Sequence, residues 1–335
     1  METSGSPVTR EAIAQHWGEA AALTQDPRSG IFGPNSISWR INRESALFLG
    51  AGRAALLQLA HPWVAAALDQ HSNLKSDPLA RFHNTFRVVF TMIFGTLEQA
   101  LAASRYLYHL HTRIQGELPE SVGAYRSGSR YDANEVGALR WVFATLVESA
   151  LLAYESVLPP LTLSEKNAYF NESKVLASLF GIPPDALPVD WQAFESYNLS
   201  MWNSNLLGVT PLSREMAHRV LNGRGTWVPI PFWYRALTAS WMPEPLRIAF
   251  ALPDTARDRR AATRALQWLP TMYLRLPAFL RFVGPYREAS CRLELRHAGP
   301  FTQWSNRFWM GEALMPFRKP SMQSTETIAT PPARD

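Results

Sequence analysis

Apolar residues recur at intervals of three and four along most of this 335-residue chain. That spacing places them on one face of an α-helix, whereas a half-buried β-strand would show strict alternation. No run of alternating β-branched residues lasts more than a few positions. The sequence therefore predicts an all-α fold.

Proline- and glycine-rich segments divide this pattern into separate helices. The expected helices are 9–23, 43–70, 77–94, 97–116, 132–157, 164–180, 190–205, 212–222, 230–240, 243–251, 255–267, 270–282 and 286–296. Asp77-Pro78 is typical of an N-cap followed by proline at the first helical position. Pro62 is expected to bend or end the second helix, because it lacks the backbone N–H that a helix interior needs.

The pattern predicts one main domain with two flanking segments. Residues 1–30 form an N-terminal helical extension, 31–318 the main domain and 319–335 a disordered tail. The tail is rich in Ser, Thr and Pro and lacks an apolar period. Apolar residues make up 47% of the chain, which is enough for the main domain to bury a core.

Cysteine content and charge exclude several classes of protein. Cys291 is the only cysteine, which excludes an intrachain disulfide framework and sites held by several thiolates. The net charge is +5, but no block of consecutive Lys or Arg occurs, so we expect no nucleic-acid partner. The densest basic group is Arg257, Arg259, Arg260 and Arg264, and a solvated helix face explains it better than a phosphate-binding surface.

No membrane segment is expected. The most apolar stretch, 46–68, is long enough to cross a bilayer, but it contains Arg53 and is interrupted by Pro62. An arginine at the middle of a bilayer costs about 2.5–3.5 kcal/mol on insertion scales, so a buried core helix is the better interpretation. The first 25 residues do not form a signal peptide. Together with the single thiol, these features favour a reducing, cytoplasmic location.

Helix phase distinguishes two neighbouring histidines in the segment 97–116. His111 shares a stripe with Leu107 and Ile114, whereas His109 lies about 200° around the helix on a polar face. His111 is therefore expected to point inward. An inward histidine is either a hydrogen-bonded core residue or a ligand for a metal or haem.

A second group of polar residues lies in the segment 77–94. Arg81, Asn84 and Thr85 are spaced three and four apart and share one helix face. Their donors would converge on one place and would suit a propionate, a dioxygen molecule or a carbonyl. The alternative is that Arg81 pairs with a core carboxylate, such as Glu148 or Asp69.

Other candidates favour structural roles. His61 precedes Pro62 and His71 lies near a helix end, so both are expected to be structural. The Glu-x-x-His unit that ends at His218 occurs once, whereas a di-iron bundle needs two. Gly50-x-Gly52 follows no strand, and close helix packing explains it better than nucleotide binding.

Tryptophans are frequent in the second half of the chain. Packing among short helices and an aromatic pocket for a flat cofactor or lipid-like substrate are both open interpretations. The residues concerned are Trp191, Trp202, Trp227, Trp233, Trp241 and Trp268.

An ordered series of motifs resembles a known family. In chain order they are Gly50-Ala51-Gly52-Arg53, Leu57-Gln58-Leu59-Ala60-His61-Pro62, His71-Ser72, Asp77-Pro78-Leu79-Ala80-Arg81, Thr85, Phe94-Gly95-Thr96, Ala100, His111-Thr112-Arg113-Ile114-Gln115-Gly116, Tyr131 and Trp141-Val142-Phe143-Ala144-Thr145-Leu146-Val147. The series resembles the catalytic domain shared by rubber oxygenase (latex clearing protein) and the mycophenolic-acid oxygenase, long described as a domain of unknown function. The resemblance covers about 40–160 and weakens toward 300.

The resemblance implies a single globin-like helical domain with a deep apolar pocket for a cofactor and a substrate. The cofactor would be haem b, and the protein would use O₂ to oxidise a small apolar or natural-product-like substrate. By this resemblance His111 is the expected axial iron ligand. Arg81, Asn84 and Thr85 would form the polar edge of the distal side and act in catalysis. His61 is a candidate for the sixth iron position.

The chain departs from the family pattern at several positions. The rubber-cleaving branch has a lysine where this chain has Asn84, and it has a catalytic carboxylate for which Asp69 is the nearest counterpart. Many relatives have a histidine where this chain has Phe143. Two other functions therefore stay open: a non-redox enzyme of the same fold in secondary metabolism, and a helical carrier of a lipid or isoprenoid. The oligomeric state is open as well.

Overall fold

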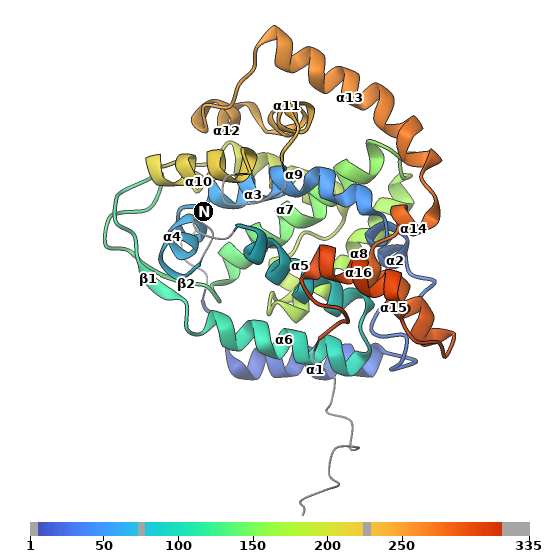
Figure 1. Cartoon of the computed structure of the whole chain (residues 1–335). Coiled ribbons are helices and arrows are strands. Elements are labelled where there is room, and N and C mark those ends of the chain that lie inside the picture. The colour runs from blue at the N-terminus through green and yellow to red at the C-terminus, as the bar shows by residue number, and fades with distance from the viewer. Residues whose placement is uncertain (1–5, 73–77, 224–228, 317–335) are drawn as a thin grey trace, which may run out of the picture.

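Helices make up most of the computed structural model, which describes residues 6–72, 78–223 and 229–316 (Figure 1). They are α1 (Arg10–Leu23), α2 (Ile37–Asn42), η1 (Ser45–Gly50), α3 (Ala51–Leu59), α4 (Pro62–His71), α5 (Pro78–Phe94), α6 (Leu97–His111), α7 (Val136–Glu155), α8 (Leu163–Leu179), η3 (Pro184–Ala186), α9 (Trp191–Trp202), α10 (Pro211–Leu221), α11 (Phe232–Trp241), α12 (Glu244–Ala249), α13 (Ala256–Arg275), α14 (Ala278–Arg281), α15 (Gly284–Leu293) and α16 (Pro300–Met310). The two η elements are short helices of the 3₁₀ type. The expected all-α fold is confirmed.

The long helix α7 passes through the middle of the molecule in Figure 1, with α3 and α10 on one side and α6 and α1 on the other. Its length and composition would let it cross a membrane, and 56% of its apolar stretch is buried inside the fold. The core helix of a globular protein meets the same criteria. The sequence stretch 46–68, in contrast, is divided among η1, α3 and α4.

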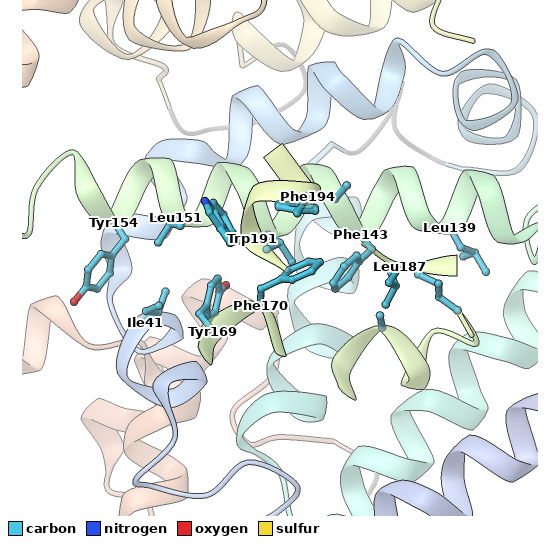
Figure 2. Packing of buried hydrophobic residues seen from close by; sticks show 14 of the residues in the cluster. Ile41, Leu139, Phe143, Leu151, Tyr154, Tyr169, Phe170, Leu187, Trp191 and Phe194 are labelled. Carbon is cyan, nitrogen blue, oxygen red and sulfur yellow. The ribbon is translucent and has the colours of Figure 1, made fainter. Parts of the chain in front are cut away.

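Aromatic side chains join α7 to α8 and α9 in the largest apolar cluster (Figure 2). Phe143 of α7 packs near Phe170 of α8, whose ring centroid lies 4.7 Å from that of Phe194 on α9. Trp191 lies 5.2 Å from Phe194 and is 4% exposed. Burial of each such ring stabilises the fold by about 1.5–3 kcal/mol. Core packing is therefore the role of Trp191.

The two glycines of the Gly-x-Gly motif allow close helix packing, as the sequence indicated. A Cβ atom at Gly50 would lie 2.3 Å from the carbonyl oxygen of Ser149 on α7. A Cβ atom at Gly52 would lie 2.9 Å from the hydroxyl of Thr238 on α11. The Gly52 N–H instead donates a hydrogen bond to the Tyr234 hydroxyl over 3.0 Å. The motif thus fixes the position of α3, which forms part of the candidate site.

An antiparallel pair of helices, α5 and α6, positions the candidate polar residues. Thr96 caps α6, and its hydroxyl and the Gln99 side chain form a reciprocal capping box. Because the chain reverses direction here, the beginning of α5 and the end of α6 lie at the same end of the pair. This arrangement brings Arg81 near His111.

The predicted helix over 97–116 is too long. Helix α6 ends at His111, and β1 (Gln115–Glu117) then pairs in antiparallel fashion with β2 (Arg130–Asp132). Ile114 therefore lies outside the helix, and its place on the His111 stripe was wrong. The backbone groups of these strands bond to a partner that is distant in sequence, so local spacing did not reveal them.

Proline had a different effect at two positions. The chain breaks between α3 and α4, immediately before Pro62, as expected. Pro270, in contrast, lies inside the continuous helix α13, where two separate helices had been predicted. Packing of α13 along α11 compensates for the one backbone hydrogen bond that Pro270 cannot make.

Two α-helices, α2 and α16, and the short 3₁₀ helix η3 were not expected from the sequence. Helix α1 of the predicted N-terminal extension packs on α8, and its Trp17 indole donates a hydrogen bond to the Ser104 hydroxyl over 2.7 Å. The division of the chain at residue 30 stays a prediction. The predicted disordered tail, 319–335, lies outside the described residues.

Candidate functional site

A largely apolar cavity of about 660 Å³ lies among η1, α3, α5, α7, α11 and α16. Its size is typical of sites that bind small molecules, which span roughly 300–1,000 Å³. Most of its lining side chains are aliphatic or aromatic, and only a few polar groups reach it. The apolar pocket expected from the sequence is therefore present.

Phenylalanines of one helix form the aromatic wall of the cavity. Phe82, Phe86 and Phe90 are spaced four apart on α5 and all line it. Phe48 of η1 packs against them and stacks on Trp309 of α16, with ring centroids 3.7 Å apart. These residues were not expected from the sequence, although the recurrence of phenylalanine at every fourth position of α5 is a signal that could have found them.

Arg81 and Thr85 reach the cavity from one face of α5, as their helix phase predicted. The Thr85 hydroxyl donates to the backbone carbonyl of Arg81 over 3.0 Å, which leaves its oxygen able to accept a hydrogen bond. The proposed carboxylate partner Glu148 binds Arg53 instead, over 2.8 Å. Among the residues that the structure describes, the Arg81 guanidinium forms no ion pair and donates no hydrogen bond. Burial lowers the pKa of the Arg81 guanidinium from its ordinary value.

Asn84 does not reach the cavity that its helix phase predicted, whereas His83 does. Asn84 is exposed and does not line the cavity. His83, two positions after Arg81 in the sequence, does line it. Its Nε2 donates to the backbone carbonyl of Phe308 over 3.1 Å and thereby connects α5 to α16. The structure therefore brings Arg81 and Thr85 together at the cavity, but not Asn84.

His111 is held in its neutral form at the end of α6. Desolvation, and next the positive charge of Arg81, lower its pKa to about 4, and the Asn134 side chain acts weakly in the opposite direction. His111 is partly exposed and does not line the 660 Å³ cavity itself. Arg81 connects the two places, because it lines the cavity and lies close enough to His111 to affect its pKa. His109 is exposed, as predicted.

His61 lies at the junction of α3 and α4 and is 3% exposed. Its Nε2 is 3.3 Å from the Tyr125 hydroxyl, and its Nδ1 has no hydrogen-bond partner among the described residues. Burial lowers the pKa of His61 to about 4 and raises that of Tyr125 to about 12. His61 is not part of the cavity wall, so the cavity geometry does not bring it together with Arg81 and Thr85.

We expect His61 to make folding pH-dependent. Its pKa is near 6.5 in the unfolded chain and about 4 in the fold, so between these values the unfolded chain binds a proton that the fold does not. Between pH 7 and pH 5, measured by urea unfolding, His61 should lower the stability by roughly 2 kcal/mol, and His111, whose pKa is also about 4, should lower it by a similar amount. His61→Gln should remove about half of that fall, because the contribution of His111 remains, whereas His109→Gln, at an exposed site, should leave the fall unchanged. An unchanged pH profile in His61→Gln would contradict this assignment.

The remaining candidates take structural positions. Glu215 of the Glu-x-x-His unit pairs with Arg219 over 2.9 Å. No group of three or more His, Cys, Asp or Glu suitable for a metal ion occurs in the part of the chain that the structure describes. Of the tryptophans singled out from the sequence, Trp227 lies outside the described residues, and none of the other five lines the cavity. The aromatic-pocket interpretation of those tryptophans was therefore wrong for the described ones.

The comparisons with known proteins identify the family. No curated protein and no solved structure matches the chain. A family model described as "ER-bound oxygenase mpaB/B'/Rubber oxygenase, catalytic domain" matches residues 39–271, which is well over half of the chain. The matched range includes Arg81, Thr85 and His111. The protein thus belongs to the mpaB and rubber oxygenase catalytic-domain family, a family of oxygenases.

Proposed function

We propose that this protein is a haem b-dependent oxygenase that uses O₂ to oxidise a small apolar substrate. One observation carries the proposal: Arg81 presents a cation without a described partner to an apolar cavity, beside the neutral imidazole of His111. Membership of an oxygenase family supports the reaction class.

The residues present fit a haem group. Neutral imidazole is the form of histidine that binds iron, and a pKa of about 4 keeps His111 in that form at physiological pH. A desolvated cation without a partner is unfavourable, so an anionic group beside Arg81 would stabilise the fold. A haem propionate would supply that charge. We therefore assign His111 as the residue that would hold the iron and Arg81 as a partner of a propionate or of the oxygen substrate.

Bound haem would supply the oxygen and electron-transfer chemistry, which side chains alone do not provide. The chain would supply position and environment. The phenylalanine wall on α5 would exclude water and hold an apolar molecule, while Arg81 would donate hydrogen bonds at its edge. The Thr85 oxygen would accept one hydrogen bond there. Asn84 is exposed, and neither Asn84 nor His61 lines the cavity or interacts with Arg81 as His111 does, so we assign them no step.

An absorption spectrum of the purified protein tests the proposal. Protein from cells supplied with a haem precursor should show a Soret band and about one haem b per chain in a pyridine haemochrome assay. A colourless protein that also takes up no haem on reconstitution would overturn the proposal. Mass spectrometry of an extract from that colourless protein would then separate a carrier, which retains a lipid or isoprenoid, from a non-redox enzyme.

A further inference from the structure

Four aromatic side chains form an exposed ladder across α14 and α16. Phe279, Phe301, Trp304 and Phe308 are 51%, 42%, 56% and 43% exposed. Successive ring centroids lie 5.2, 5.6 and 6.2 Å apart, so the rings form one continuous surface. Contiguous exposed apolar surface of this kind marks an interaction site more often than scattered single residues do.

The aromatic ladder leads into the cavity. Phe308 is both exposed and a cavity-lining residue, so the cavity reaches the molecular surface beside α16. Its ring centroid lies 4.6 Å from that of Trp309, which stacks on Phe48 inside the cavity. The apolar surface on the outside is thus continuous with the apolar wall on the inside.

The positive charge of the protein is concentrated in the same segment. Residues 256–310 contain ten arginines and three acidic residues, a net charge of +7. The rest of the chain has 23 basic and 25 acidic residues, a net charge of −2. Of the three acidic residues, Asp258 and Glu288 are buried and Glu294 pairs with Arg296. Two of the arginines also pair with carboxylates outside the segment, Arg259 with Asp254 and Arg281 with Glu44, so the surface of the segment keeps a smaller basic excess.

Some of these arginines lie directly beside the apolar groups. The Arg287 guanidinium lies over the Phe301 ring, 4.6 Å from its centroid. On α13, which leads directly into α14 (Figure 1), two exposed apolar residues lie between two exposed arginines along one stripe. The stripe consists of Arg264, Trp268, Met272 and Arg275, spaced four, four and three residues apart.

We propose that the surface formed by α13, α14 and α16 docks on an anionic lipid membrane. Tryptophan and phenylalanine side chains are favourable at the boundary between headgroups and acyl chains, and arginines are attracted to anionic headgroups. The charge argues against a second copy of the chain, because two faces of the same positive sign would repel each other. This surface is separate from the apolar helix α7. Docking on the membrane would not require bound haem.

Vesicle sedimentation tests the docking surface. The protein should sediment with vesicles of phosphatidylcholine mixed with phosphatidylglycerol, and much less with phosphatidylcholine alone. High salt should release it, because ions screen the attraction. Arg264→Gln together with Arg275→Gln should weaken binding to the anionic vesicles on the order of thirtyfold, since each arginine near the surface contributes about one factor of five to six.

Matched variants separate a membrane surface from the alternatives. The double variant Phe301→Ser with Trp304→Ser should lose binding. Leu23→Ser, at an even more exposed apolar site on α1, should bind like the parent. Circular dichroism and an unchanged unfolding midpoint would show that the variants are folded. The proposal fails if the parent protein ignores anionic vesicles or if Leu23→Ser loses as much binding. It also fails if the Phe301→Ser and Trp304→Ser double variant binds vesicles like the parent and differs from it only by forming a monomer instead of a dimer in sedimentation velocity.

Discussion

His111→Ala is expected to weaken haem binding by more than about 100-fold. Loss of a residue that merely orients a metal ligand costs 10–100-fold in metal affinity, so loss of the ligand itself should cost more. His111 is neutral because desolvation and Arg81 lower its pKa to about 4, which is the condition for binding iron. Haem titration followed by absorbance would measure the affinity, and turnover would be expected to fall with it.

His109→Ala is the matched control for this experiment. It removes an imidazole from the same helix two residues away, at an exposed position. The control should keep the haem affinity and the Soret position of the parent. A His111→Ala protein with full haem content and full turnover would exclude His111 as the essential ligand, even if the parent protein binds haem.

Arg53→Met is expected to destabilise the fold by about 3 kcal/mol, near the lower end of the range for breaking a buried ion pair. Arg53 is 2% exposed and donates hydrogen bonds to the Trp241 carbonyl, the Glu148 carboxylate and the Ser149 hydroxyl. Methionine would fill much of the same space but leave these acceptors without a donor. The Glu148 side chain is 18% exposed, so water would stabilise part of its charge.

Urea unfolding would measure the loss, with Arg40→Met as the control. Arg40 also pairs with a glutamate, Glu165, over 2.7 Å, but the side chains are 41% and 36% exposed. Exposed pairs contribute less than about 1 kcal/mol. An equal loss of unfolding free energy in the two variants would mean that burial does not determine how much the Arg53 ion pair stabilises the fold.

Features that depend on one helix could be predicted from the sequence. Arg81 and Thr85 reach the cavity together because residues four apart on a helix share a face whatever surrounds it. The break before Pro62 follows from the chemistry of proline alone. The distinction between His109 and His111 held because it depended on phase within α6, although that helix is shorter than predicted.

Features that depend on two distant segments could not be predicted. The sequence offered Glu148 as a partner for Arg81, but the fold places it beside Arg53, 95 residues away in the chain. Nothing in the local pattern ranks one arginine over another. The aromatic residues of α16 have a helical spacing, yet the face that they share is exposed. An apolar period usually predicts a buried face, and that prediction would be wrong for this helix.

Helix α16 lies outside the matched range 39–271, yet its Phe308 and Trp309 form part of the cavity wall. The groups assigned to oxygen chemistry, Arg81 and His111, lie inside that range. Substitutions in α16 would reshape the space that a substrate enters and leave those groups in place. Substrate preference can therefore diverge between members of the family without a change in the reaction, and exchange of this one helix is a direct route for redesign.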